Sequence, residues 1–96
     1  MRPSIALDQH RGDIRHVVKL HHATNARVFG SVAHGSDKDG SDLDLVIDPT
    51  LQTTLMDIAA IQVALEALLG VPVDVVTPNA LPDSFRDSVL ADAVPV

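Results

Sequence analysis

Cysteine is absent from this sequence of 96 residues. Disulfide bonds, a thiolate nucleophile and a zinc site built on sulfur are therefore excluded, and the absence suits a reducing compartment such as the cytoplasm. Aromatic side chains are almost as scarce, with two Phe and neither Trp nor Tyr. Because the hydrophobic residues still make up 46% of the chain, the predicted core is aliphatic, built from Val, Leu, Ile and Ala.

Basic residues are also few: seven Lys and Arg stand against thirteen Asp and Glu, for a formal net charge of −6. A protein that grips nucleic-acid backbones needs the opposite balance, so stable nucleic-acid binding by this chain alone is disfavoured. The longest apolar stretch, 55–69, is interrupted by Asp57, Gln62 and Glu66, and no stretch resembles a secretion signal. We therefore expect a cytoplasmic protein whose residues 1–96 form a single domain, with no membrane span.

The hydrophobic pattern predicts helices alternating with short strands. The predicted elements are a helix over 8–23, a strand over 26–29, a turn or very short helix with a loop over 31–41, a strand over 42–48, a helix over 53–69, a strand over 71–76 and a helix from Pro82. Such an alternation is typical of an α/β or α+β domain, and we expect a small mixed β-sheet covered by helices.

The predicted helix ends follow from local signals. Asp8 is a plausible N-cap of the first helix, and Asn25 stands where a left-handed residue ends one. Thr54 and Asp57 have the spacing of a capping box for the helix over 53–69, and Gly70 follows its last apolar residue. That helix carries a continuous apolar stripe, which we interpret as core: Leu55, Ile58, Ile61, Leu65, Leu68 and Leu69.

Three carboxylates suggest metal chemistry. Asp42 and Asp44 are two residues apart on a predicted strand, so their side chains leave the same face, with Cα atoms about 7 Å apart. Hard divalent cations such as Mg²⁺ prefer such oxygen ligands. Asp74 is the lone acid in the apolar strand VPVDVV. If this strand lies beside the strand of Asp42 and Asp44, Asp74 completes a three-carboxylate cluster able to hold two metals about 4 Å apart. The plainer reading is that all three are solvated strand-edge acids.

A phosphate-binding turn precedes this cluster. Gly30 ends a strand and lets the backbone approach a ligand closely, and Ser31 adds a hydroxyl donor, although a turn residue or helix cap explains Ser31 as well. With Ser41 beside the acids, these are the candidate nucleotide-binding residues. Asp37 and Asp39 are interpreted as loop charges and Lys38 as a solvated charge. The histidines at 10, 16, 21 and 22 are interpreted as surface or core residues rather than zinc ligands.

The segment VFGSVAHGSDKDGSDLDLVID resembles the signature of the DNA-polymerase-β-type nucleotidyltransferases, Gly-Ser followed by a spaced Asp-x-Asp. More narrowly, the chain is similar to the minimal nucleotidyltransferases (MNT) that act as antitoxins in HEPN/MNT toxin–antitoxin pairs. The resemblance implies that Gly30 and Ser31 bind the triphosphate of ATP. It also implies that Asp42 and Asp44 ligate two Mg²⁺ ions, and that Asp74 ligates the catalytic metal and helps to activate the acceptor hydroxyl. The sequence departs at His34, where family members often have Arg.

Three functions remain open at this point. The first is transfer of AMP from ATP to a hydroxyl of a protein partner; the resemblance suggests a tyrosine of a HEPN-type toxin. We prefer it because transferases acting on small molecules or polynucleotides need an additional domain to position the acceptor. The second is an antitoxin that neutralises its partner by binding alone, which the His34 departure favours. The third is a nucleotidyltransferase of the antibiotic-modifying kind. Association with itself or with a partner is also expected.

Overall fold

Four strands form the sheet of this computed structural model, which describes residues 1–96. Their order across the sheet is β3-β2-β1-β4, with β1 at Ala23–Phe29, β2 at Leu43–Pro49, β3 at Val73–Val76 and β4 at Val94–Pro95. β1 runs antiparallel to both β2 and β4, whereas β3 runs parallel to β2. The predicted fold class, a small mixed sheet covered by helices, is confirmed.

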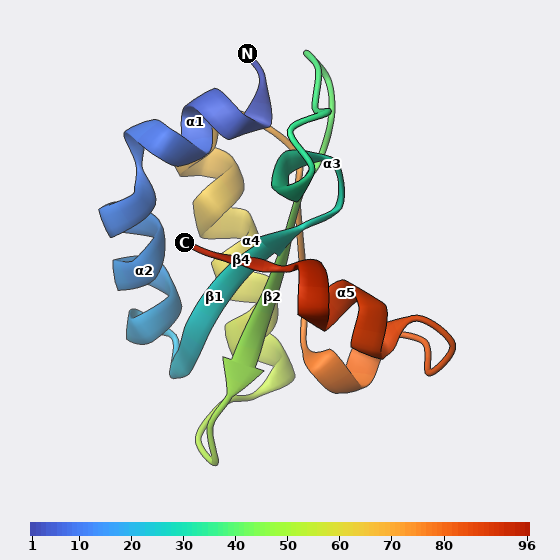
Figure 1. Ribbon diagram of the computed structural model, residues 1–96. Helices are drawn as coiled ribbons and strands as arrows, with labels where there is room; N and C mark the ends of the chain where they lie inside the picture. Colours follow the sequence, from blue (N-terminus) through green and yellow to red (C-terminus); the bar gives the residue numbers. More distant parts are fainter.

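Two of the helices pack on one face of this sheet. α2 (Arg11–Leu20) packs on β1, α4 (Leu55–Leu69) packs on β3, and the two helices contact each other. In Figure 1 α4 lies behind the sheet and α2 lies to its left. α1 (Pro3–Gln9) leads into α2, and α5 (Arg86–Asp92) crosses the other face near β1. None of the helices combines the length and the apolar character that crossing a membrane requires.

The central strand β2 divides its side chains between the two faces. Leu43, Leu45 and Ile47 are fully buried in the core between the sheet and the helices α2 and α4. Asp44 lies between them in the strand and is therefore directed to the opposite face, where it is half-buried. The packing of the leucines thus determines which way the carboxylate of Asp44 points, because a one-residue slip would exchange the two faces.

The helix predicted over 53–69 is present as α4, which begins two residues later, at Leu55, and carries both of the predicted end signals. The Thr54 hydroxyl accepts a hydrogen bond from the Asp57 amide while the Asp57 carboxylate accepts one from the Thr54 amide, which completes the predicted capping box. Gly70 adopts the left-handed conformation, with φ 69°, and ends the helix. The predicted stripe is wrong at Leu55 and Leu68, which are 84% and 36% exposed, while the helix buries Ile61, Leu65 and Leu69.

The prediction of one helix over 8–23 is wrong. Two short helices replace it, broken at His10, and Asp8 lies inside the first of them instead of capping the second. The chain leaves α2 at Leu20 and enters β1 already at Ala23. Asn25 does adopt a positive φ of 53°, but inside β1, where the pairing with β2 shifts between Thr24 and Arg27. The left-handed residue marks a β-bulge, not a helix end.

The C-terminal segment also differs from its prediction. The last helix begins at Arg86 and not at Pro82, and a short 3-10 turn, η1 (Pro78–Ala80), precedes it. β4 was not predicted at all, because two residues carry no strand periodicity. This strand forms only because Val28 and Arg27 of β1 offer it an edge.

Candidate functional site

Asp44 and Asp74 lie directly opposite each other in the sheet. They are register partners in the parallel pairing of β2 and β3, so their Cα atoms are about one strand spacing apart, roughly 4.8 Å. Asp44 is half-buried and Asp74 is exposed on the outer strand of the sheet. The structure therefore brings together the two acids that the sequence separates by a whole helix.

Asp42 lies at the same end of the sheet but not within it. β2 begins at Leu43, so Asp42 is the last residue of the preceding loop, and it is exposed. The prediction that Asp42 and Asp44 both project from one strand is wrong in this respect. A loop residue has more freedom than a strand residue, so the position of Asp42 depends on what holds the loop over 34–42.

The pKa of Asp44 is raised above its ordinary value of 3.8. Burial is the largest cause, and the negative charges of Asp74 and Asp42 add to it. The three carboxylates thus influence one another, although no three acidic or imidazole side chains converge closely enough to form a ready metal cluster. Repulsion between the like charges keeps the three carboxylates apart when no cation is bound. Their hard oxygen atoms, with the ionised form of Asp44 disfavoured, are the kind of donor set that Mg²⁺ prefers.

Gly30 closes the site on the other side of Asp44. Phe29 pairs with Asp44 across β1 and β2, and Gly30 follows it with φ +71° at the start of the short helix α3 (Gly30–Ala33). A Cβ atom on Gly30 would stand 2.5 Å from Oδ2 of Asp44. Only glycine therefore fits here without displacing the carboxylate, and its missing side chain lets the backbone lie against Asp44.

Ser31 and Ser41 differ in their surroundings. Ser31 is half-buried in α3, and its carbonyl oxygen accepts a hydrogen bond from the Ser36 amide at 2.9 Å. The Ser41 hydroxyl accepts a hydrogen bond from the Lys38 amide at 2.9 Å, while the Ser41 amide donates to the Lys38 carbonyl. Ser41 thus closes a turn immediately before Asp42, and its hydroxyl hydrogen stays available to a ligand.

Asp37 is not the loop charge that the sequence predicts. Its side chain is buried, with 4% of the residue exposed, and it accepts hydrogen bonds from the Ser4 amide at 2.9 Å and from Arg2 at 3.2 Å. The Ser4 amide is the main reason why the pKa of Asp37 lies below its ordinary value. Both partners are more than thirty residues away in sequence, so no local signal identifies them. Asp39 remains an exposed loop charge.

The histidines lie outside this site or at its rim. His34 follows α3, is exposed, and has its Nε2 atom 3.5 Å from a carboxylate oxygen of Asp92 on α5. His10 contacts Asp13 at 3.1 Å and His22 contacts Asp57 at 3.4 Å, each through Nδ1. These contacts become ion pairs only when the imidazole is protonated.

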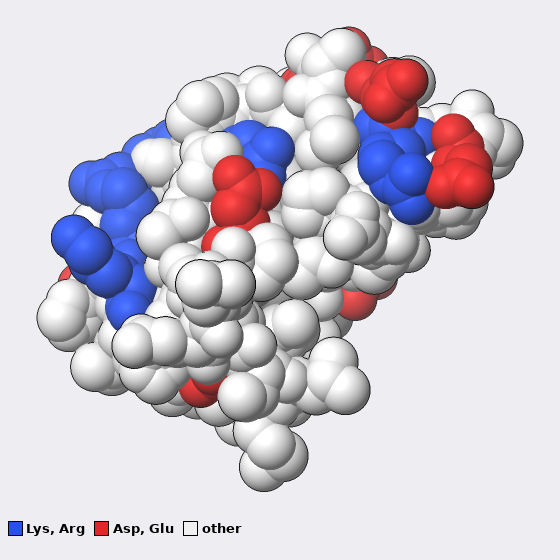
Figure 2. All heavy atoms as spheres, turned by 90° about the horizontal axis from the view of Figure 1, so that it is seen from below, with Lys and Arg blue, Asp and Glu red and all other residues white.

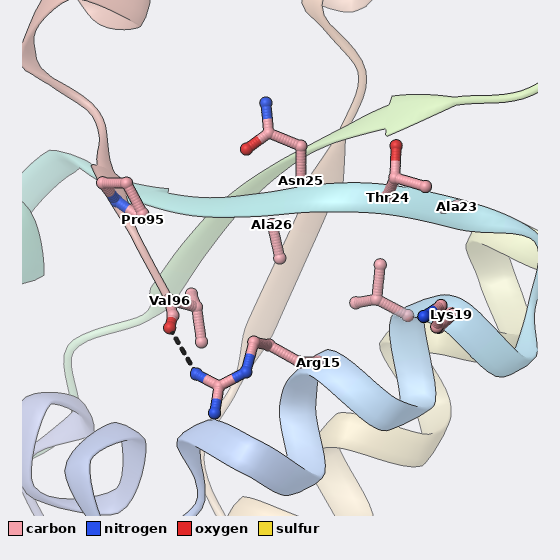
Figure 3. A pocket seen from close by; sticks show the side chains of 9 residues that line it. Arg15, Lys19, Ala23, Thr24, Asn25, Ala26, Pro95 and Val96 are labelled. Atoms are coloured by element: carbon pink, nitrogen blue, oxygen red, sulfur yellow. Dashed lines mark hydrogen bonds between the residues drawn. The ribbon is translucent and has the colours of Figure 1, made fainter.

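The largest cavity lies away from the carboxylates. It has a volume of about 430 Å³ and opens between α2, the first half of β1 and the C-terminal residues Pro95 and Val96, as Figure 3 shows. Arg15 reaches across it to donate a 2.7 Å hydrogen bond to the carbonyl of Val96. None of Gly30, Asp44 and Asp74 lines it. The site is therefore an open end of the sheet and not an enclosed pocket.

The raised pKa of Asp44 has a consequence for stability. A carboxyl group that binds its proton more tightly in the folded state destabilises the fold above that pKa and ceases to do so as the pH falls through it. In EDTA, lowering the pH from 7 to just above 4 should therefore raise the Asp44 contribution to the unfolding free energy. Asp37 and Asp57 have pKa values below 3.8 in the folded protein, so their ionised carboxylates stabilise the fold. This stabilisation is lost as the pH falls below about 3.8, and the unfolding free energy then decreases. Thermal unfolding of the wild type and of Asp44→Asn across this range should differ most near neutral pH; a constant difference would contradict the shift.

Comparison with known proteins places this geometry in a family. Residues 13–96 match the family described as polymerase beta, nucleotidyltransferase. A Methanocaldococcus jannaschii protein named as a protein adenylyltransferase is 34% identical over 80 residues, which are 83% of this chain and 86% of that protein. The protein adenylyltransferase MntA of Thermococcus cleftensis is 36% identical over 67 residues, 70% of this chain and 68% of its own.

Solved structures agree with the sequence relatives. A protein described as a minimal nucleotidyltransferase superposes with a TM-score of 0.79 at 42% identity, covering 94% of this chain and 95% of its own. A toxin–antitoxin crystal structure with AMP-PNP superposes with a TM-score of 0.74, covering 88% of this chain and 69% of that chain. At 16% identity the second likeness bears on the fold alone. The chain belongs to the polymerase β nucleotidyltransferase family, and it has the fold of a minimal nucleotidyltransferase.

Proposed function

We propose that this nucleotidyltransferase transfers AMP from ATP to a hydroxyl group of a protein, and that this protein is a HEPN-type toxin modified on a tyrosine. The observation that carries the proposal is the pairing of Asp44 with Asp74 next to Gly30, whose backbone lies against the Asp44 carboxylate. Two sequence relatives named as protein adenylyltransferases support the reaction. One chain of the toxin–antitoxin structure solved with AMP-PNP has the same fold, and we propose a toxin as partner and ATP as donor by analogy with it.

The residues divide into a phosphate end and a metal end. Gly30, Ser31 and Ser41 would bind the triphosphate through backbone and hydroxyl donors. Asp42, Asp44 and Asp74 would hold the Mg²⁺ ions, which when bound offset the negative charge of the phosphates and of the three carboxylates. Because the pKa of Asp44 is raised by burial and by its acidic neighbours, this group gains most from a bound cation.

In the reaction, the acceptor oxygen forms a bond to the α-phosphorus of ATP. The bond from that phosphorus to the oxygen bridging to the β-phosphate breaks, and pyrophosphate leaves. The proton of the acceptor hydroxyl passes to the carboxylate of Asp74, which is the exposed member of the pair. Asp74 lies on the outer strand β3, so an acceptor can approach it from outside the sheet.

A protein acceptor suits the surface of this chain. Thirteen acidic residues against seven basic ones disfavour a nucleic-acid acceptor, whose phosphates would be repelled. The open end of the sheet has no enclosing pocket that would orient a small molecule. A folded partner brings its own complementary surface and can hold its hydroxyl beside Asp74, which supplies the proximity that the reaction requires.

Neutralisation by binding alone is the second candidate, and one observation favours it. Several large apolar side chains are exposed on the outer face of α4 and on the loop before it: Leu51, Leu55, Met56 and Val63. Figure 2, which looks at this end of the molecule from below, is almost free of charged atoms in its lower half. Exposed apolar patches of this kind are typical of protein interfaces, and such an interface would act without turnover.

Co-expression with the toxin separates the two candidates. The wild-type chain should add AMP-sized increments to the intact mass of the toxin and restore growth. The double variant Asp42→Asn, Asp44→Asn should still co-purify with the toxin but leave its mass unchanged and growth arrested. Full restoration of growth by the double variant would show that binding suffices. An unmodified toxin alongside wild-type rescue would count against AMP transfer.

A further inference from the structure

The buried carboxylate of Asp37 joins the N-terminal segment to the loop between the phosphate end and the metal end of the site. Oδ2 accepts from the Ser4 amide, and Oδ1 accepts from a guanidinium nitrogen of Arg2. The Arg2 Nε atom also donates to the backbone carbonyl of Asp37 at 3.1 Å. One arginine therefore holds both the side chain and the backbone of a single loop residue, in the two-point geometry that guanidinium favours.

These contacts satisfy hydrogen-bonding groups both at the start of α1 and in Asp37. The helix α1 begins at Pro3 without a side-chain cap from its own N-terminal residues, and Asp37 supplies an acceptor to its first turn from across the molecule. A buried carboxylate without partners would be costly, and Arg2 and the amide remove that cost. Figure 1 shows the N-terminus beside the loop over 34–42 at the end of the sheet where α3 lies.

Apart from a solvent-exposed ion pair between Asp39 and the N-terminal ammonium of Met1, the loop has few other restraints. Its first part is tied to α3 by hydrogen bonds from Gly35 and Ser36 to the carbonyls of Val32 and Ser31. Its last part is closed by the reciprocal bonds between Lys38 and Ser41. Between these two turns, Asp37 is the only residue of the loop that is buried. Asp42 follows the second turn and precedes Leu43, the buried first residue of β2, so the loop and the strand meet at this residue.

We propose that Asp37 is a positioning residue, which Arg2 and Ser4 hold so that Ser41 and Asp42 are in place for a nucleotide and its metal. This role rests on the proposed function, since it assigns a purpose to the same site. Arg2 and Ser4 lie outside residues 13–96, the part that matches the family. The N-terminal segment is thus a part of the site that the family signature does not contain.

The test compares two loop acids that are two residues apart. Asp37→Asn removes the anchor charge, whereas Asp39→Asn makes the same chemical change at a carboxylate whose side chain is 82% exposed. Asp39 contacts the N-terminal ammonium of Met1 at 3.1 Å, but an ion pair this exposed to solvent contributes little. Binding of Mg²⁺ and ATP is measured by calorimetry, and hydrogen exchange of the amides between Ser36 and Ser41 is followed in parallel. Asp37→Asn should raise the Mg²⁺ concentration for half-maximal ATP binding about tenfold, the usual effect of losing a residue that orients a metal ligand.

The same variant should speed amide exchange in the loop but not in β2, and Asp39→Asn should change neither quantity. Arg2→Ala keeps the Ser4 contact and tests the anchor if Asp37→Asn folds poorly; Arg2→Lys, which retains the charge but not the fork, should fall between Arg2→Ala and the wild type. A lower melting temperature with unchanged Mg²⁺ dependence and loop exchange would reduce Asp37 to a structural role and overturn the proposal. Binding is measured without any acceptor, so failure of AMP transfer to a protein would leave this result interpretable.

Discussion

Replacing Asp44 with Asn should reduce the rate of AMP transfer by about a thousandfold or more, because it removes a charged ligand from the centre of the proposed metal site. Asp44 is the acid that both neighbours influence, and it is register partner to Asp74. Asn is close to the same size, so the strand β2 and its buried leucines should be unaffected. The rate is measured at saturating Mg²⁺ and ATP, with Asp39→Asn as the control for loss of one acidic charge.

The same substitution should make the metal-free protein more stable. It removes the like-charge repulsion between directly opposed residues, which for cross-strand pairs amounts to about 0.5 kcal/mol. For a domain of this size that corresponds to a rise of about 2–4 °C in the unfolding temperature in EDTA. A variant that loses activity while gaining stability is the signature of a functional acid. Loss of both would instead indicate that Asp44 supports the fold, and retention of activity would remove it from the site.

Replacing Gly30 with Ala should damage the fold and the reaction together. The backbone at this position has φ +71°, where a side chain costs about 1–2 kcal/mol, and the new Cβ would stand 2.5 Å from Oδ2 of Asp44. We expect the unfolding temperature to fall by about 4–8 °C or more and the transfer rate to fall at least about a hundredfold, because Asp44 must move.

Gly70, which lies outside the loop over 34–42, provides the matched control for this variant. It has a similar φ of +69°, but a Cβ on Gly70 meets nothing within 4 Å. Gly70→Ala should therefore show a similar loss of stability while the transfer rate per folded molecule stays near that of the wild type. If the two alanine variants lose activity equally, backbone strain is the common cause and the contact between Gly30 and Asp44 has no special role.

Local signals allowed α4 and the end of the sheet to be predicted from the sequence. The capping box of Thr54 and Asp57 and the left-handed Gly70 are short-range features, and each is present in the structure. The pairing of the strands that carry Asp44 and Asp74 follows from two apolar runs separated by one helix, which is the usual origin of neighbouring parallel strands.

Contacts between distant parts of the chain account for what could not be predicted. The burial of Asp37 depends on Arg2 and Ser4, and β4 depends on a free edge of β1, so neither has a local signature. Asn25 was predicted to end a helix because the same left-handed conformation serves a helix end and a β-bulge. Asp42 was assigned to the strand because the sequence pattern does not show where pairing between strands begins. In the structure the pairing of β2 begins at Leu43, which leaves Asp42 in the loop.

The most direct measurement follows the two ends of ATP separately. The chain and the toxin are incubated with Mg²⁺ and with ATP labelled either in the α-phosphate or in the γ-phosphate. Nucleotidyl transfer at the site of Gly30, Asp44 and Asp74 predicts that the α-label becomes bound to the toxin and that the γ-label appears in pyrophosphate. Incorporation of the γ-label, or of neither label while the toxin is nevertheless neutralised, would contradict it.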